Sequence, residues 1–130
     1  MDADGRVLLV RHVPEREGFW EGKWICPGGR LELGESIEEG IMREVAEETH
    51  LGIRLLTPLV PFERIVKSEN ETALHVIYID YLAEVVEGEL KADSDVGEAI
   101  WVDETALMGM WGELHEDTQK LLKIAKIVWG

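Results

Sequence analysis

The succession of strand and helix signals along this 130-residue sequence predicts an α+β fold with a mixed β-sheet. Short apolar runs typical of strands are interspersed with two helical patterns. Regular strand–helix–strand alternation is missing, which disfavours a doubly wound parallel sheet. Because the length suits one domain and no repeat or linker divides the chain, we expect residues 1–130 to form a single domain.

The N-terminal part predicts two short strands separated by a loop. Val7–Val10 is an apolar run that follows the turn-forming pair Asp4-Gly5, a pattern typical of a strand after a turn. Residues 11–23 are polar and contain proline and glycine, so we expect a loop there. Trp24–Cys26 is a second short strand candidate, ended by a Pro-Gly-Gly sequence.

A helix is predicted for residues 36–49. Ser36 and Glu39 have the spacing of a capping box, in which both side chains satisfy backbone N–H groups at the start of a helix. The apolar residues recur every four positions, at Ile37, Ile41 and Val45. The segment therefore predicts an amphipathic helix that begins after Ser36.

The second half predicts further strands and a terminal helix. Residues 53–66 are apolar but contain Pro58 and Pro61, so we expect an irregular or edge strand. Residues 73–86 are rich in β-branched and aromatic side chains and predict one long strand. The last expected elements are a strand at 99–102, a short helical turn capped by Asp103, and a helix over 114–129.

The composition is strongly acidic, with 13 Lys and Arg against 27 Asp and Glu and a formal net charge of −14. Such a surface repels phosphate backbones and anionic lipids, so we expect no nucleic-acid or membrane partner. A small phosphate compound would need a bridging divalent cation. The single Cys26 excludes an internal disulfide, no apolar run reaches membrane-spanning length, and the acidic N-terminus is unlike a signal peptide, so we expect a cytoplasmic protein.

The densest acidic segment is Glu32–Glu48, in which 17 residues hold seven carboxylates and one basic residue. Within it Glu44, Glu47 and Glu48 share one face of the predicted helix, where like charges repel one another. A hard cation that prefers oxygen ligands, Mg²⁺ or Mn²⁺, would reverse this repulsion. A solvated acidic helix face without a metal is the alternative interpretation.

A longer motif surrounds these carboxylates. It reads Gly29-x5-Glu35-x7-Arg43-Glu44-Val45-x-Glu47-Glu48-x-His50-Leu51, preceded by Trp24-Ile25-Cys26-Pro27-Gly28. This closely resembles the signature of the MutT-like Nudix hydrolases, and eight of the nine specified positions match. The segment Glu98–Val102 resembles the same family, so the resemblance extends from about Gly5 to Leu107.

The resemblance implies an α/β/α sandwich and a pyrophosphohydrolase reaction. In that reaction water attacks a phosphorus atom of a nucleoside diphosphate linked to another moiety, and cations stabilise the charge on the phosphoryl oxygens. By matching positions, Glu47 and Glu48 are implied Mg²⁺ ligands, Glu44 is a ligand or the general base, and the Gly29 carbonyl is a further ligand. Arg43 is implied to orient these carboxylates, and Mn²⁺ is an expected substitute for Mg²⁺.

The resemblance also implies functional residues outside the helix. The family often takes an additional Glu from a loop, and Glu98 is our choice as ligand or base from a loop that also holds Asp93 and Asp95. Glu35 is expected to pair with the motif arginine rather than to touch metal. Among the aromatic residues, Trp20 in the N-terminal loop is the best candidate to stack on a nucleotide base.

Two features depart from the family pattern. His50 stands where the motif has a glycine that ends the helix in a left-handed conformation. Either His50 adopts that conformation, which histidine tolerates better than most residues, or the helix continues to Gly52. The chain also starts almost directly at Val7–Val10, without the family's first strand. We expect this to leave a sheet edge that a partner subunit or the acidic N-terminal residues could cover.

We expect the activity to be hydrolysis of ADP-ribose or a sugar nucleotide. The alternatives are a (d)NTP pyrophosphatase that removes unwanted nucleotides, and a non-catalytic nucleotide-binding module, which is disfavoured because every acidic motif position is present. The proline that many ADP-ribose hydrolases carry after the motif is replaced by Lys67, so the substrate stays open. A homodimer is expected because of the absent strand and the apolar end, Val128-Trp129, of the terminal helix.

Overall fold

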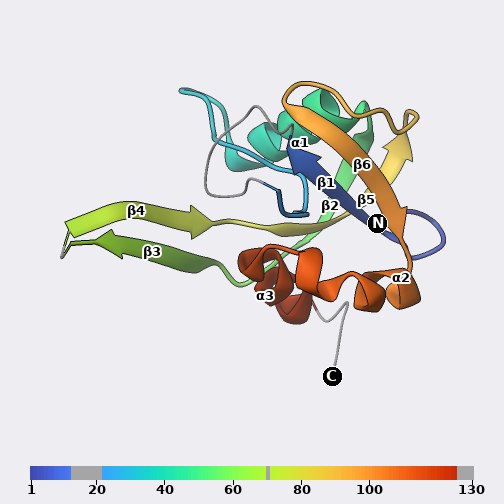
Figure 1. Cartoon of the computed structure of the whole chain (residues 1–130). Helices are drawn as coiled ribbons and strands as arrows, with labels where there is room; N and C mark the ends of the chain where they lie inside the picture. Colours follow the sequence, from blue (N-terminus) through green and yellow to red (C-terminus); the bar gives the residue numbers. More distant parts are fainter. Residues whose placement is uncertain (13–21, 70, 126–130) are drawn as a thin grey trace.

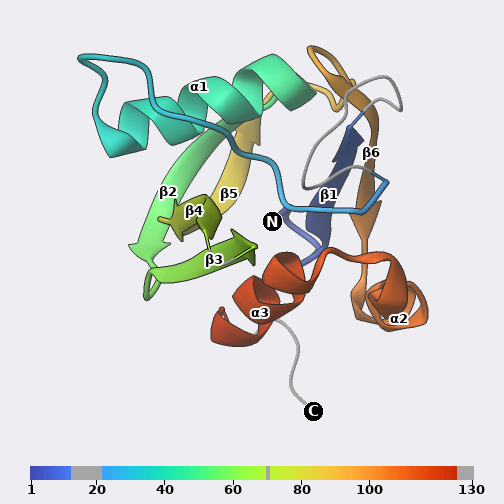
Figure 2. The same cartoon turned by 60° about the vertical axis from the view of Figure 1, so that its left-hand side comes forward.

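The computed structural model describes residues 1–12, 22–69 and 71–125 and confirms the α+β fold. Its strands are β1 (Val7–His12), β2 (Gly52–Pro58), β3 (Phe62–Ser68), β4 (Glu71–Tyr78), β5 (Tyr81–Glu87) and β6 (Val96–Val102). Its helices are α1 (Ile37–Thr49), α2 (Glu104–Gly109), the short 3-10 turn η1 (Trp111–Glu113) and α3 (Glu116–Ile124). Figures 1 and 2 show α1 on one side of the strands and α2 with α3 on the other, the layered arrangement that the resemblance implies.

Strand β1 is central because both of its faces are covered. It pairs with the antiparallel strand β6, and its successive side chains point to opposite faces. Leu8 packs with Val45 of α1, whereas Leu9 packs against α2 and α3. Coverage on both faces explains why this strand is a continuous apolar run. The buried residues on the α2 and α3 side are Val7, Leu9, Trp24, Val102, Leu107, Leu114 and Leu122.

The segment from β2 to β5 forms a long two-stranded antiparallel ribbon. β2 pairs with β5, and β3 pairs with β4. The expected single strands over 53–66 and 73–86 are each divided in two, at 59–61 and at 79–80. Pro61 lacks a backbone donor and so cannot continue the ladder. The two breaks adjoin one another, because the Leu59 N–H donates to the Asp80 carbonyl at 2.9 Å.

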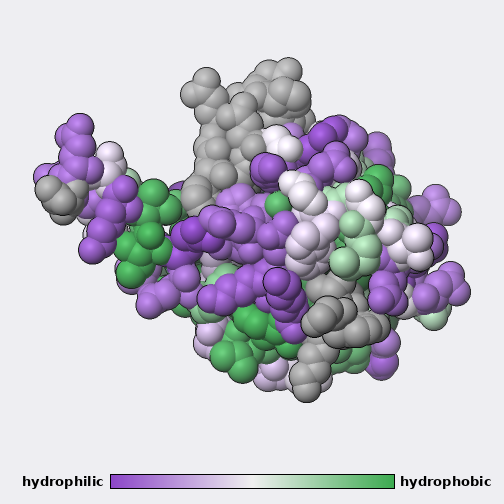
Figure 3. All heavy atoms as spheres, turned by 60° about the horizontal axis from the view of Figure 1, so that its bottom comes forward, coloured by the Kyte–Doolittle hydropathy of each residue, from purple (hydrophilic) through white to green (hydrophobic). Residues whose placement is uncertain are grey.

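The β3–β4 hairpin projects away from the rest of the molecule (Figure 1). Its base is anchored to α3, since the Tyr78 hydroxyl and the Arg64 guanidinium both donate to the Asp117 carboxylate at 2.6 Å. Farther out, Ile65 and Ile77 are 46% and 64% exposed. Figure 3 shows apolar surface on this projecting part, so the hairpin offers hydrophobic area for contact.

The segment at Trp24 forms isolated bridges rather than the expected strand. Ile25 exchanges two backbone hydrogen bonds with Val10, at 2.8 and 2.9 Å. Trp24 forms a parallel bridge with Leu114, which adds a parallel contact to the antiparallel pairs. Leu114 is therefore extended, and the expectation of a helix from residue 114 is wrong.

The terminal helix begins two residues later than the apolar pattern predicts. His115 is its N-cap, and the His115 Nδ1 atom accepts a hydrogen bond from the Asp117 N–H at 3.1 Å. Val128 and Trp129, on which part of the dimer expectation rests, lie outside the described residues. None of the described helices is long and apolar enough to cross a membrane.

The N-terminal residue lies along an edge of β5. The Met1 amine donates to the Ala83 carbonyl at 2.8 Å, and the Met1 carbonyl accepts from the Val85 N–H at 3.0 Å. Met1 thus covers part of one edge of β5 through hydrogen bonds to two of its residues.

Candidate active site

Helix α1 begins and ends where the sequence predicts, and this fixes the direction of its carboxylates. The Ser36 hydroxyl accepts a hydrogen bond from the Glu39 N–H at 3.1 Å. At the other end His50 is left-handed, with φ 62°, and its N–H donates to the Ala46 carbonyl. His50 therefore takes the conformation that the motif glycine usually supplies, and Gly52 already belongs to β2.

Arg43 is the centre of a hydrogen-bond network beside this helix. Its guanidinium donates to both carboxylate oxygens of Glu35 at 2.8 Å, to Glu44 at 2.9 Å and to Glu47 at 3.2 Å. Hydrogen bonds from Arg43 lower the pKa of Glu35 to about 2 and, in return, raise the pKa of Arg43. The expected pairing with Glu35 is confirmed, and the same arginine orients two motif carboxylates.

The glycine-rich loop before α1 packs directly against these carboxylates. A Cβ atom placed on Gly29 would lie 2.4 Å from the carboxyl carbon of Glu44. The neighbouring Gly28 has no such restriction, but its N–H donates to Glu48 Oε1 at 2.9 Å. Gly29 is therefore needed for close approach of backbone to side chain.

Glu48 lies apart from the Arg43 network, in a different group. It is 2% exposed and joins His12 at the end of β1 and Asp95 just before β6. Within the described ranges these three side chains are the one set of three potential metal ligands whose atoms lie within 4.8 Å of one another. An imidazole and two carboxylates are suitable ligands for a divalent cation.

The loop that carries Asp95 is fastened to the C-terminal end of α1. The Lys91 N–H donates to the Thr49 carbonyl, and the Asp93 N–H donates to the Glu48 carbonyl, both at 3.0 Å. Carbonyls at a helix end have no partner within the helix, so the loop satisfies them. This arrangement holds Asp95 at a set position beside the helix end.

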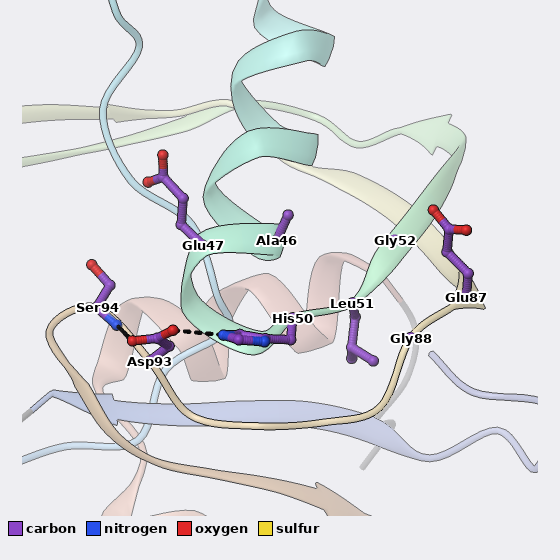
Figure 4. A pocket seen from close by; sticks show the side chains of 9 residues that line it. All are labelled: Ala46, Glu47, His50, Leu51, Gly52, Glu87, Gly88, Asp93 and Ser94. Carbon is purple, nitrogen blue, oxygen red and sulfur yellow. Dashed lines mark hydrogen bonds and ion pairs between the residues drawn. The ribbon is translucent and has the colours of Figure 1, made fainter.

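A pocket of about 650 Å³ opens at this helix end (Figure 4). His50 Nε2 lies 2.6 Å from Asp93 Oδ2, and this contact lowers the pKa of the Asp93 carboxyl. Figure 4 shows Glu47 and Glu87 on either side of His50. His50 thus contacts a loop side chain, in agreement with the expected surface histidine at the helix end.

Glu98 lies in strand β6 and not in the expected loop. It is opposite Arg11 of β1 and forms an ion pair with it. Adjacent strands place these two side chains on the same face, away from the Glu48 group. The structure therefore does not bring Glu98 into the group of Glu48, His12 and Asp95, and Trp20 lies outside the described residues.

Sequence reasoning missed His12. A register shift between Arg11 and His12 places His12 opposite Val96, the residue that follows Asp95 in the sequence. Such bulges re-aim a side chain. The only signal in the sequence is a polar residue at the end of an apolar strand, which is too common to indicate a site.

A family model described as NUDIX domain matches residues 1–123, nearly the whole chain. The chain belongs to the NUDIX family. It is 31% identical over 123 residues to an ADP-ribose pyrophosphatase of Methanocaldococcus jannaschii, covering 95% of this chain and 67% of that protein. It is 35% identical over 113 residues to an oxidized purine nucleoside triphosphate hydrolase of Danio rerio, covering 84% and 67%. The chain thus spans about two thirds of the length of these two Nudix relatives.

A third Nudix relative is matched over most of its own length. The nucleoside triphosphatase NudI of Escherichia coli is 30% identical over 129 residues, with 93% of this chain and 88% of that protein covered. Among solved structures, a NUDIX hydrolase from Nitrosomonas europaea has a TM-score of 0.77 at 22% identity and covers 96% of this chain and 82% of its own. A MutT NUDIX hydrolase from Burkholderia pseudomallei has a TM-score of 0.76 at 26% identity, covering 93% and 88%. The chain is a Nudix hydrolase, as its sequence predicts.

Proposed function

We propose that this Nudix hydrolase is a Mg²⁺-dependent pyrophosphohydrolase that cleaves ADP-ribose or a sugar nucleotide by attack of water on phosphorus. The observation that carries the proposal is the packing of the Gly28-Gly29 backbone against Glu44 and Glu48, with Arg43 orienting the former. This arrangement concentrates oxygen donors of the kind that Mg²⁺ prefers. It also reconciles an acidic protein with an anionic substrate.

Each motif residue has a proposed task. Glu44, Glu47, Glu48 and the Gly29 carbonyl would hold Mg²⁺, for which Mn²⁺ can substitute. When bound, the cation supplies positive charge to the phosphoryl oxygens. Alternatively, Glu44 would not bind the cation but would serve as the general base that accepts the proton of the attacking water. Arg43 keeps the carboxylates of Glu44 and Glu47 oriented.

A carboxylate from outside the motif is also proposed to bind the cation. Glu98 is engaged by Arg11 on β1. Asp95 lies beside Glu48, and its loop is fastened to the end of α1. We therefore propose Asp95 rather than Glu98 as the additional ligand.

The ADP-ribose class is supported by the relative from Methanocaldococcus jannaschii, whose name is ADP-ribose pyrophosphatase. A (d)NTP pyrophosphatase is the second candidate, because two other relatives are named nucleoside triphosphate hydrolase and nucleoside triphosphatase. A non-catalytic nucleotide-binding module is a third hypothesis. Trp20 is proposed to stack on the base in either enzyme, so Trp20→Ala should raise KM more than it lowers kcat.

The test is a substrate panel with the purified full chain and Mg²⁺. ADP-ribose, sugar nucleotides, dinucleoside polyphosphates and (d)NTPs are incubated separately, and products are separated by chromatography. Release of AMP from ADP-ribose supports the proposal, whereas release of pyrophosphate from a triphosphate supports the second candidate. If nucleotides bind but none is cleaved, the proposed activity is wrong. Omission of metal is the matched control.

We also propose a homodimer. The projecting hairpin exposes Ile65 and Ile77, and a two-stranded hairpin gains stability when a partner packs against it. Light scattering at micromolar concentration should give twice the mass of the chain. A monomeric mass contradicts the proposal.

A further inference from the structure

We propose that His12, Glu48 and Asp95 form a mixed imidazole–carboxylate metal site that favours a first-row transition-metal cation over Mg²⁺. His12 lies outside the Nudix motif and supplies the nitrogen ligand. The inference rests on the proposed function in one respect: it names the cation that the same active site would bind most tightly.

The three side chains are already close and largely shielded from water. Glu48 is 2% exposed, and the side chains of His12 and Asp95 are 11% and 28% exposed. His12 Nδ1 lies 3.3 Å from the Asp95 carbonyl and 3.6 Å from its Oδ1 atom. Because the ligands are gathered by folding, little side-chain freedom remains to be lost on binding.

Each ligand is held by a different backbone constraint. The register shift at the end of β1 sets His12 opposite Val96, next to Asp95. The Asp93 N–H is bonded to the Glu48 carbonyl, which ties the loop to the last turn of α1. The Gly28 N–H binds one Glu48 oxygen and orients that carboxylate. Such outer contacts keep ligands in position around a metal.

The ligand types decide the preference. Mg²⁺ favours an octahedral shell of oxygen atoms and retains much of its water. Imidazole nitrogen binds first-row transition metals better, with affinity rising from Mn²⁺ through Fe²⁺ to Co²⁺. Two carboxylates balance the charge of a divalent ion, and His12 adds a bond that Mg²⁺ exploits poorly. We therefore expect selectivity for Mn²⁺ or Co²⁺.

The experiment measures metal binding without nucleotide. The full chain is titrated calorimetrically with Mn²⁺, Co²⁺ and Mg²⁺ in turn, for the wild type and His12→Ala. The variant should bind Mn²⁺ and Co²⁺ at least about tenfold more weakly, while the Mg²⁺ affinity changes less than about twofold. The absorption spectrum of bound Co²⁺ should change as well, since a nitrogen ligand is lost.

Controls separate this inference from a structural effect. His75→Ala removes an exposed histidine that pairs with Glu63 on the hairpin, and it should leave all three affinities unchanged. His12→Gln retains side-chain bulk, so it serves if His12→Ala does not fold. Asp95→Asn should weaken Mn²⁺ and Co²⁺ as His12→Ala does.

The outcomes distinguish the two proposals. Unchanged binding of Mn²⁺ and Co²⁺ by the folded His12 and Asp95 variants overturns the metal site, even if the wild type hydrolyses a nucleotide. Conversely, loss of Co²⁺ binding in these variants, together with no hydrolysis of any nucleotide by the wild type, supports the site and refutes the proposed function.

Discussion

We predict that Asp80 makes the stability of the folded protein decrease as the pH rises. Its Oδ2 atom is buried without a hydrogen-bond partner within the described part of the chain, and burial raises the pKa of this carboxyl from 3.8 to about 6. A pKa difference between the folded and unfolded states changes the free energy of unfolding by up to about 1.4 kcal/mol for each pKa unit. Ionisation of Asp80 therefore lowers the free energy of unfolding by about 3 kcal/mol at pH 8 but only by about 0.5 kcal/mol at pH 4.

The sign follows from the raised pKa. The protonated acid is favoured in the folded state, so its stabilisation is fully present below pH 3.8 and is lost as the pH rises through about 6. Asp80→Asn cannot ionise, so it should raise the free energy of unfolding at pH 8 by up to about 3 kcal/mol and have little effect at pH 4.

Urea unfolding followed by tryptophan fluorescence measures this difference, because Trp24 is buried in the folded protein. The experiment is run between pH 4 and pH 8 on wild type and Asp80→Asn. Asp4→Asn, at an exposed carboxylate, is the matched control and should show no such trend. A difference between Asp80→Asn and wild type that does not grow with pH would refute the reasoning.

Three further predictions concern helix α1 and its loop. Glu48→Gln should lower Mg²⁺-dependent turnover at least about a hundredfold with folding retained, because the proposed Mg²⁺ ligand loses its charge. Near-normal turnover in the product assay would contradict this role. Gly29→Ala should lower kcat much more than Gly28→Ala, since only the Gly29 substitution adds a Cβ in contact with Glu44. Equal effects in steady-state kinetics would contradict the close packing of Gly29 against Glu44. His50→Val should have a free energy of unfolding about 1–2 kcal/mol lower than that of His50→Gly, because a β-branched residue is strained at φ 62°. Equal unfolding midpoints for the two variants would contradict this.

Local features of the sequence were sufficient where short-range forces decide the structure. The cap at Ser36, the helix over 37–49 and the apolar strand at Val7 depend on neighbours along the chain. The motif spacing likewise places Glu47 within reach of Arg43, since residues four apart share a helix face. These elements needed no knowledge of distant segments.

Distant contacts decided the rest. Pro61 signals the break in the run at 53–66, but no residue of the run at 73–86 signals its break at 79–80. That break depends on how Leu59 and Asp80 meet across two strands. The proposed choice of Asp95 over Glu98 as a ligand also depends on contacts between distant segments. Both are acidic and three residues apart, but strand pairing turns Glu98 toward Arg11 and the loop carries Asp95 to Glu48.

By itself, therefore, the sequence determined the family, the acidic helix and the chemistry expected of it, since a motif with fixed spacing encodes local geometry. Only the tertiary structure decided that His12 meets Glu48 and Asp95, because their positions along the chain lie far apart and a single register shift beside β6 brings them together. Side-chain direction in a strand reverses with each residue, so sequence proximity alone cannot say which polar group faces the site.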